Sequence, residues 1–444
     1  MGSQRPHSLW SSEPKTGNGA VLWLGLVVLL WVFDFWAIDR YESEARAVPA
    51  LLRSGLCGGM CLFLLTKASF LTRVRSACLM SALALLILCG FARVLGDWGD
   101  AVSTYSKLLR YLYPPVVFLT ACAIGGRGRF SENWAVMAGL AVLLVVGSKM
   151  GVLHQRGELK TKFVQEAEDP TLQSRENMGY SIVCCAPLLL WGARRRVPPT
   201  VAASLVVCVA LALIAGKRGA IVALAGGILT FLAIQMRDRW RMRIQLVAVV
   251  IAVGLVGGFF FAQHRYALAD DWRDVEDPDR IGSGRGVIYR AVLQGWFDAS
   301  PVQMVVGRGL LGAMEVTYER LGVRKAAHSD VLEVLTEHGI LGLLVYVALF
   351  VELIRLCMWA VGSRHPAAGP FGAALVMILL PSLYSMALVG QNAVVNWLAL
   401  GLGAGEIASA RLQMGGGLIR HGRPSGRRGV YSKWREGYLA APAR

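Results

Sequence analysis

The chain has 444 residues, 55% of them hydrophobic, and it carries a formal net charge of +17. Apolar stretches of about 20 residues recur along nearly its whole length, and each is long enough to cross a bilayer as a helix. This composition indicates a polytopic membrane protein. The basic residues show no aromatic-interleaved motif and no zinc-knuckle spacing, which argues against a nucleic-acid partner.

The apolar runs predict an all-α membrane protein with about 12 transmembrane helices. They lie near residues 19–37, 47–66, 76–96, 108–125, 134–153, 178–192, 198–216, 219–236, 243–263, 339–359, 369–389 and 391–410. The predicted organisation is an N-terminal tail (1–18), nine helices (19–263), a long loop (264–338), three helices (339–410) and a basic tail (411–444).

Basic residues gather in alternate connecting segments, among them 194–196, 237–243 and the tail at 411–444. Lysine and arginine in short loops normally stay on the cytoplasmic side of a membrane. This pattern predicts that both termini are cytoplasmic and that the loop at 264–338 lies on the outer face. The tail is expected either to lie on anionic lipid headgroups or to be a disordered, solubilising segment.

Lys217 and Arg218 break this charge pattern. They lie in a short interruption between two apolar runs, on the predicted outer face of the membrane. A basic pair at that edge indicates an anionic partner. The segment Gly216–Gly219 lacks the upstream glycine and the following serine or threonine of a phosphate-binding loop, so nucleotide binding is rejected.

A first helix is predicted in the long loop at residues 284–296. Its apolar face consists of Ile288, Val292 and Trp296. Arg285 shares this face because it lies three residues before Ile288, whereas Arg290 turns away from it. Arg285 therefore points either at the body of the protein, where it can bind a ligand, or into an ion pair or snorkelling position that has no functional role.

A second loop helix is predicted at residues 328–337. Its apolar stripe consists of Val331, Leu332 and Leu335, and its opposite, solvated face consists of Asp330, Glu333 and Glu337. His328 falls on the stripe at the helix N-terminus, where the helix dipole disfavours the imidazolium form. The neutral ring can accept a proton near neutral pH. The alternative for His328 is a packed core histidine.

Three separated segments form an ordered set on the predicted outer face. They are Ala-Gly-Lys-Arg-Gly-Ala at 215–220, Ser-Gly-Arg at 283–285 with Trp296, and Gly-Arg-Gly at 307–309 with His-Ser-Asp at 328–330 and Glu-His-Gly-Ile-Leu-Gly at 337–342. This set resembles the motifs of the O-antigen ligase and polymerase superfamily. Lys217 stands where that family often has serine and Ser329 where it often has asparagine, which leaves the acceptor type open.

The resemblance implies a bacterial inner-membrane glycosyltransferase of the C-type fold, with its active site on the periplasmic face and no metal or other cofactor. The implied donor is a glycan on undecaprenyl diphosphate, and the acceptor is lipid A core or another lipid-linked glycan. Arg218 and Arg285, assisted by Lys217, are expected to bind the diphosphate. His328 is expected to be the general base. Second-rank candidates are Arg308, Arg290, Asp330 and His338.

A membrane transporter or flippase for a lipid-linked glycan is the main alternative, since it also has about 12 spans and buried charges. Transporters often show paired halves with broken helices near mid-membrane, and the sequence shows no matching halves. A scaffold that regulates chain length is a third class. It would have little use for Arg218 and His328.

Overall fold

The computed structural model describes residues 23, 25–29, 47–94, 101–126, 132–155, 174–194, 197–215, 218–235, 281–385 and 391–420. Within these ranges the chain forms helices joined by turns, and no strand occurs there. The helices are α2 (Ala47–Leu65), α3 (Ala68–Leu71), α4 (Arg75–Val94), α5 (Ala101–Gly125), α6 (Glu132–Gln155), α8 (Ser174–Trp191), α9 (Pro199–Ala215), α10 (Arg218–Gln235), α13 (Ile281–Phe297), α14 (Pro301–Val306), α15 (Gly312–Leu321), α16 (Asp330–Gly362), α17 (Ala368–Tyr384) and α18 (Gln391–Arg420). The prediction of an all-helical fold is confirmed for this part of the chain.

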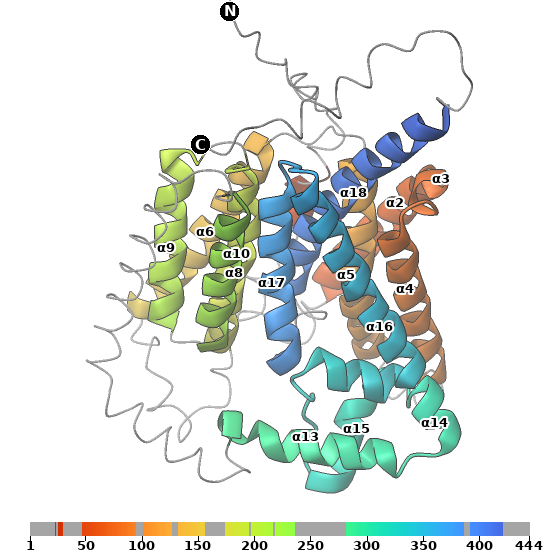
Figure 1. The fold of residues 1–444 in the computed structure, drawn as a ribbon. Coiled ribbons are helices and arrows are strands. Elements are labelled where there is room, and N and C mark those ends of the chain that lie inside the picture. Colours follow the sequence, from red (N-terminus) through yellow and green to blue (C-terminus); the bar gives the residue numbers. More distant parts are fainter. Residues whose placement is uncertain are drawn as a thin grey trace, which may run out of the picture.

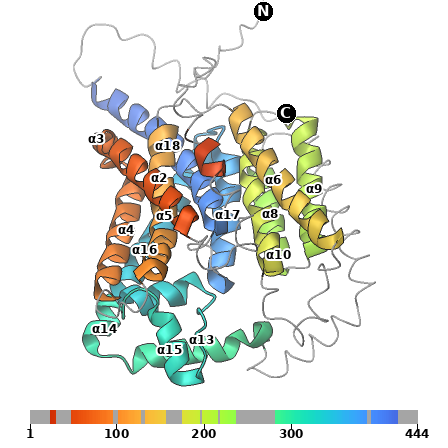
Figure 2. The same ribbon diagram turned by 180° about the vertical axis from the view of Figure 1, so that it is seen from behind.

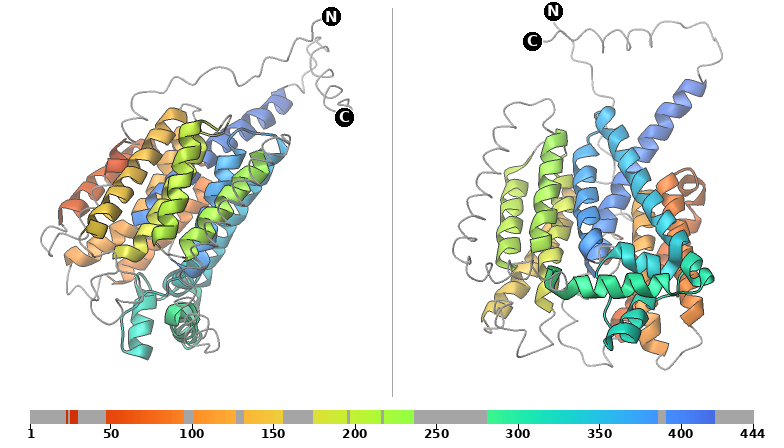
Figure 3. Two further views of the ribbon diagram at one scale, coloured as in Figure 1. Left: turned by 90° about the vertical axis from the view of Figure 1, so that its left-hand side faces the viewer. Right: turned by 60° about the horizontal axis from the view of Figure 1, so that its bottom comes forward.

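The long helices form one bundle, and α13, α14 and α15 lie across one of its ends (Figure 1). This end is called the loop end below. Helix α17 stands in the middle of the bundle, packed against α8 and α10 on one side and against α16 and α18 on the other. Figure 2 shows α2, α4 and α5 beyond α16 and α18, while α6 and α9 complete the opposite side. Figure 3 shows α13 running across the loop end, roughly perpendicular to the bundle helices.

Small residues let the helices of the bundle approach closely. At Gly401 and Gly405 of α18, an added Cβ would lie 2.4 Å from the carbonyl oxygen of Phe118 and 1.9 Å from that of Cys122 in α5. Backbone-to-backbone approach of this kind is how helices pack where lipid supplies no hydrophobic driving force between them. Next to this contact, Phe118 and Trp397 meet edge to face, with ring centroids 5.8 Å apart.

Two described helices are long and apolar enough to cross a membrane, Glu132–Val152 and Asp330–Gly362. Shorter apolar helices cover Ser54–Leu65, Arg75–Phe91, Tyr111–Gly125, Gly179–Trp191, Pro199–Ala215, Gly219–Gln235 and Ala368–Tyr384. Each predicted apolar run whose residues are described is therefore helical, but the number of membrane crossings stays a prediction. The run near 243–263, most of the run near 19–37 and the tail residues 421–444 lie outside the described residues.

The loop helices have a small core of their own. Ile288 and Val292 of α13 are buried against Ala313 of α15 and Ala327, as the predicted apolar face of the first loop helix requires. A capping box starts α14, in which Ser300 accepts from the backbone N–H of Gln303 while the Gln303 side chain accepts from the N–H of Ser300. These contacts give the loop end a defined structure rather than a loose connection.

Candidate active site

Three helix ends meet at Tyr384, the last residue of α17. Its carbonyl oxygen accepts a hydrogen bond from the guanidinium of Arg285, which is half-buried on α13. Its phenol donates to the carbonyl oxygen of Gly219 at 2.6 Å. Gly219 is the second residue of α10 and directly follows Arg218. Arg285 and the start of α10 are therefore brought together at the loop end of the bundle.

The same arginine is linked to His328 through Tyr289. The Tyr289 phenol, one helical turn beyond Arg285, donates to the carbonyl oxygen of His328 at 3.2 Å. Partial burial raises the pKa of Tyr289, and the nearby positive charge of Arg285 offsets part of that rise. Tyr289 therefore remains a hydrogen-bond donor at physiological pH. Arg285, Tyr289 and the His328 turn form a continuous polar contact.

The sequence had predicted that His328 begins the second loop helix, and the structure shows that it does not. Helix α16 begins at Asp330 with Ser329 as its N-cap residue, and His328 precedes it with a left-handed backbone, φ 55°. This conformation is uncommon for a non-glycine residue and has to be held by its surroundings. The Tyr289 phenol holds one side of the turn, and the Glu333 carboxyl, which accepts from the N–H of Ala327 at 2.6 Å, holds the other.

The prediction that Asp330, Glu333 and Glu337 form a solvated face is wrong, because all three side chains are at most 3% exposed. Backbone donors replace the lost water. Glu337 accepts from the N–H of Leu311 at 2.7 Å and from the phenol of Tyr111 at 3.3 Å. Burial raises the pKa of Glu333 to about 7 and that of Glu337 well above its usual range.

The Gly-Arg-Gly and Glu-His-Gly motifs proved to be two halves of one packing contact. The first turns of α16 end at Gly339, which has φ 65° and ψ −164°, so the carbonyls before it lose their helical donors. The N–H of Arg308 donates to Thr336 at 2.8 Å, and the N–H of Gly309 donates to Glu337 at 3.0 Å. The two motifs thus complete each other's backbone hydrogen bonding.

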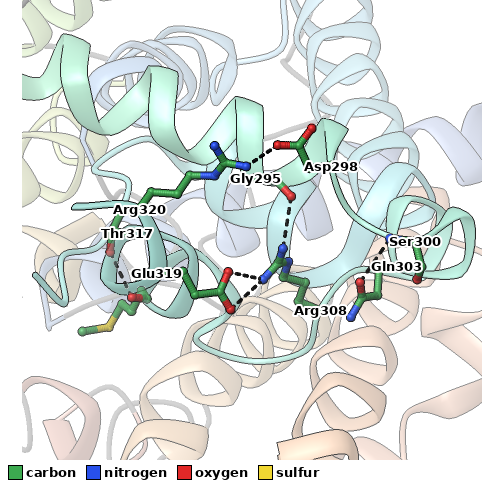
Figure 4. A network of polar contacts seen from close by, with 9 residues as sticks. Gly295, Asp298, Ser300, Gln303, Arg308, Thr317, Glu319 and Arg320 are labelled. Carbon is green, nitrogen blue, oxygen red and sulfur yellow. Dashed lines mark hydrogen bonds and ion pairs between the residues drawn. The ribbon is translucent and has the colours of Figure 1, made fainter. Parts of the chain in front are cut away.

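The second-rank candidates have different surroundings, and only Asp330 directly follows the His328 turn. Figure 4 shows the Arg308 guanidinium directed at Glu319, 2.9 Å away, and at the carbonyl oxygen of Gly295. Arg290 is exposed on α13. His338 is buried, with Nε2 4.0 Å from the Glu337 carboxylate and its ring beside Gly90 of α4. Asp330, the remaining candidate, is buried at the start of α16.

Lys217 and the side chain of Arg218 lie outside what the structure describes. The backbone of Arg218 begins α10, so the position of this residue follows from its neighbour Gly219. Among the described residues, no group of three or more His, Cys, Asp or Glu side chains is arranged to hold a metal ion.

Residues 203–347 match the family described as O-antigen ligase. The chain carries an O-antigen ligase domain. This finding confirms the predicted place of the protein in the O-antigen ligase and polymerase superfamily. The domain includes the start of α10, Arg285 and His328, whereas Tyr384 lies beyond it. Together with the apolar helices, it indicates a membrane protein. No curated protein matches the chain.

Sequence reasoning missed the tyrosines of this site and the role of Glu333. Tyr289 had a local signal, since it lies four residues after Arg285 on one helix. Tyr384 had none, because it is separated from Gly219 by 165 residues and from Arg285 by 99. Glu333 was assigned to the solvated face because the helical pattern does not show that α13 and α15 pack there.

Proposed function

We propose that the protein is a glycosyltransferase of the O-antigen ligase or polymerase type. It transfers glycan from undecaprenyl diphosphate to an acceptor sugar on lipid A core or on another lipid-linked repeat unit. The observation that carries the proposal is the meeting of Arg285, the start of α10 and the His328 turn at one end of the bundle. The O-antigen ligase domain at 203–347 supports the same activity.

In this reaction the acceptor hydroxyl attacks the anomeric carbon of the donor from the face opposite the diphosphate. A new bond forms between the acceptor oxygen and that carbon, and the bond to the diphosphate oxygen breaks with inversion. The bonding electron pair leaves on the diphosphate, and the hydroxyl proton passes to the imidazole of His328. General-base assistance of this kind contributes about 10²–10⁴-fold to rate.

Arg218 and Arg285, assisted by Lys217, bind the leaving diphosphate. Arginine suits this role because its planar donors bind phosphate oxygens in pairs and because it keeps its charge at any physiological pH. Charge grows on the diphosphate as the glycosidic bond breaks, and a preorganised donor at such a position can contribute about 3 kcal/mol to the transition state. The arginines perform the charge neutralisation, so the reaction needs no metal ion.

The proposed setting is the bacterial inner membrane, with both termini cytoplasmic and the site on the periplasmic face. In this arrangement the loop at 264–338 covers the sugars of the donor and acceptor. The helices on either side of it, at 19–263 and 339–410, contact lipid and the polyprenyl chain. The basic residues in alternate connections support this orientation.

Glycan transfer by the purified protein in liposomes tests the proposal. The donor is undecaprenyl-diphosphate oligosaccharide, offered with lipid A core or with a second lipid-linked unit. Product on the core identifies a ligase, and a ladder on the lipid carrier identifies a polymerase. His328→Ala should lose at least 10²-fold in rate. His365→Asn is the matched control, because His365 lies between α16 and α17 at the opposite end of the bundle.

Full transfer by His328→Ala would remove His328 as the base. Absence of transfer to either acceptor by the wild-type protein would count against the proposal. If the same liposomes moved the lipid-linked glycan across the bilayer, the protein would instead be a flippase.

A further inference from the structure

Tyr384 contacts both of the elements that carry the proposed diphosphate arginines. Its carbonyl oxygen, at the C-terminal end of α17, has no acceptor role within the helix and accepts from the Arg285 guanidinium. Its phenol reaches the other element and donates to the carbonyl oxygen of Gly219 at 2.6 Å. One residue thus connects α13 with the first turn of α10.

The contact with α10 depends on the glycine at position 219. A Cβ there would lie 2.4 Å from Cε2 of Tyr384 and 2.7 Å from the hydroxyl of Tyr180. Real Cβ contacts are essentially never this short, so a side chain at 219 would displace the tyrosine ring or the helix start. The ring therefore rests directly on the backbone next to Arg218.

We infer that Tyr384 is a positioning residue that fixes Arg218 and Arg285 relative to each other, so that the pair fits a diphosphate. The inference rests on the proposed function, because that function assigns both arginines to the diphosphate. Holding the two backbones that carry these arginines at a set separation favours two linked phosphates over a single phosphate. Such preorganisation avoids the ordering of flexible side chains when the donor binds.

The test compares Tyr384→Phe and Gly219→Ala with Gly227→Ala. The Phe variant keeps the ring and the backbone carbonyl that binds Arg285, and removes only the hydrogen bond to Gly219. Gly227 is the matched control, because it also lies on α10 facing α17, where a Cβ would lie 2.3 Å from Cε and 2.5 Å from Cγ of Met377. It is two helical turns away from the arginines.

Two comparisons are made on full-length protein in liposomes. In the first, the KM for the lipid-diphosphate donor is compared with the KM for the acceptor. In the second, the affinity for inorganic pyrophosphate is compared with the affinity for inorganic phosphate. Tyr384→Phe and Gly219→Ala should each raise the donor KM about tenfold and weaken pyrophosphate binding by a similar factor, while the acceptor KM and phosphate affinity stay unchanged. Gly227→Ala should behave as wild type in all four.

A Tyr384→Phe protein with wild-type donor KM and pyrophosphate affinity would overturn the inference. Equal effects of Gly219→Ala and Gly227→Ala would overturn it too, because general loosening of the α10–α17 contact would then explain both. If the wild-type protein transfers no glycan, the proposed function fails, and the pyrophosphate affinities alone test the positioning role. Weaker pyrophosphate binding in Tyr384→Phe and Gly219→Ala, but not in Gly227→Ala, would then support it. Absence of pyrophosphate binding in the wild type would overturn it.

Discussion

At the scale of single residues, Glu333 and Tyr289 hold the turn that presents His328. Glu333 belongs to α16 and Tyr289 to α13, and each side chain forms a hydrogen bond with a backbone group of the turn. The two contacts that hold the turn, at a His328 φ of 55°, use main-chain atoms of Ala327 and His328. A candidate base whose backbone is fixed by its neighbours needs little rearrangement when the acceptor binds.

Glu333→Gln should make the stability of the protein less dependent on pH. Burial raises the pKa of Glu333 to about 7 from an ordinary value of 4.5, so the folded protein holds this proton longer than the unfolded chain. The contribution of protonated Glu333 to stability is therefore fully present below about pH 4.5, and it is lost as the pH rises through about 7. At pH 8 the loss is up to about 3 kcal/mol.

The measurement is the free energy of unfolding of wild type and Glu333→Gln at pH 5 and pH 8. The charge of Glu333 also helps to raise the pKa of buried Glu337, so the difference between the two proteins reports the ionisation of this pair of carboxyls. Equal pH dependence in the two proteins would show that Glu333 ionises as an exposed carboxyl does.

Arg308→Ala tests whether the second-rank arginine is structural. The substitution removes the ion pair with Glu319 and leaves the carbonyl of Gly295 without its donor, which should lower the free energy of unfolding by about 2 kcal/mol. Arg320→Ala breaks a more exposed pair with Asp298 and should lower it by less than about 1 kcal/mol. A raised donor KM in folded Arg308→Ala would instead return Arg308 to the diphosphate site.

At the scale of elements, α16 is two helices joined at Gly339. The first turns, from Asp330, lie across the loop end and carry Glu333 and Glu337, and the longer part continues into the bundle (Figure 1). The break lets the segment at 307–309 reach the carbonyls of Thr336 and Glu337. The kink thus connects the loop helices to the bundle and sets where the His328 turn lies.

Gly339→Ala should destabilise the protein by about 3 kcal/mol or more, or prevent folding. Its φ of 65° and ψ of −164° belong to a region that only glycine enters readily, and a Cβ would lie 2.4 Å from the backbone carbon of Val305. Gly362→Ala, at the far end of the same helix, has nothing within 4 Å and serves as the control. The unfolding temperature and the yield of monodisperse protein measure the difference. Similar values for both variants would contradict the prediction.

At the scale of the whole molecule, polar contacts gather at the two ends of the bundle. At the end opposite the loop helices, buried Arg194 bonds to Glu132 of α6 at 2.7 Å and to Glu406 of α18 at 3.1 Å, and its carbonyl accepts from Gln235 of α10. Burial and the Arg194 charge lower the pKa of His365 to about 4, so this ring stays neutral. Arg194, three residues after the end of α8, thus connects α6, α10 and α18.

Arg194→Ala should lower the free energy of unfolding by about 2 kcal/mol. It leaves Glu132 and Glu406 without their shared cation, although both carboxylates are partly exposed, so the effect falls below that of a fully buried pair. Arg355→Ala is the control, since Arg355 is 66% exposed and 3.9 Å from Glu352. Denaturant unfolding in detergent compares them, and an equal effect of both variants would refute a special role for Arg194.

Much of this protein follows from local sequence. The described long helices of the bundle lie where apolar runs predicted them, since a hydrophobic run of bilayer length is a property of neighbouring residues, whereas α14 and α15 were not predicted. The apolar face of α13 was predicted for the same reason, because Ile288 and Val292 lie one turn apart. The ordered motifs from 215 to 342 also sufficed to predict the superfamily that the O-antigen ligase domain confirms.

Only the tertiary structure decided which side chains meet. Periodicity separates apolar from polar faces but does not show what packs on the polar one, and so Glu333 and Glu337 are buried against backbone donors from the loop. The contacts of Tyr384 join parts of the chain 99 and 165 residues apart. Such contacts arise because packing of whole helices, rather than local propensity, fixes the relative positions of their ends.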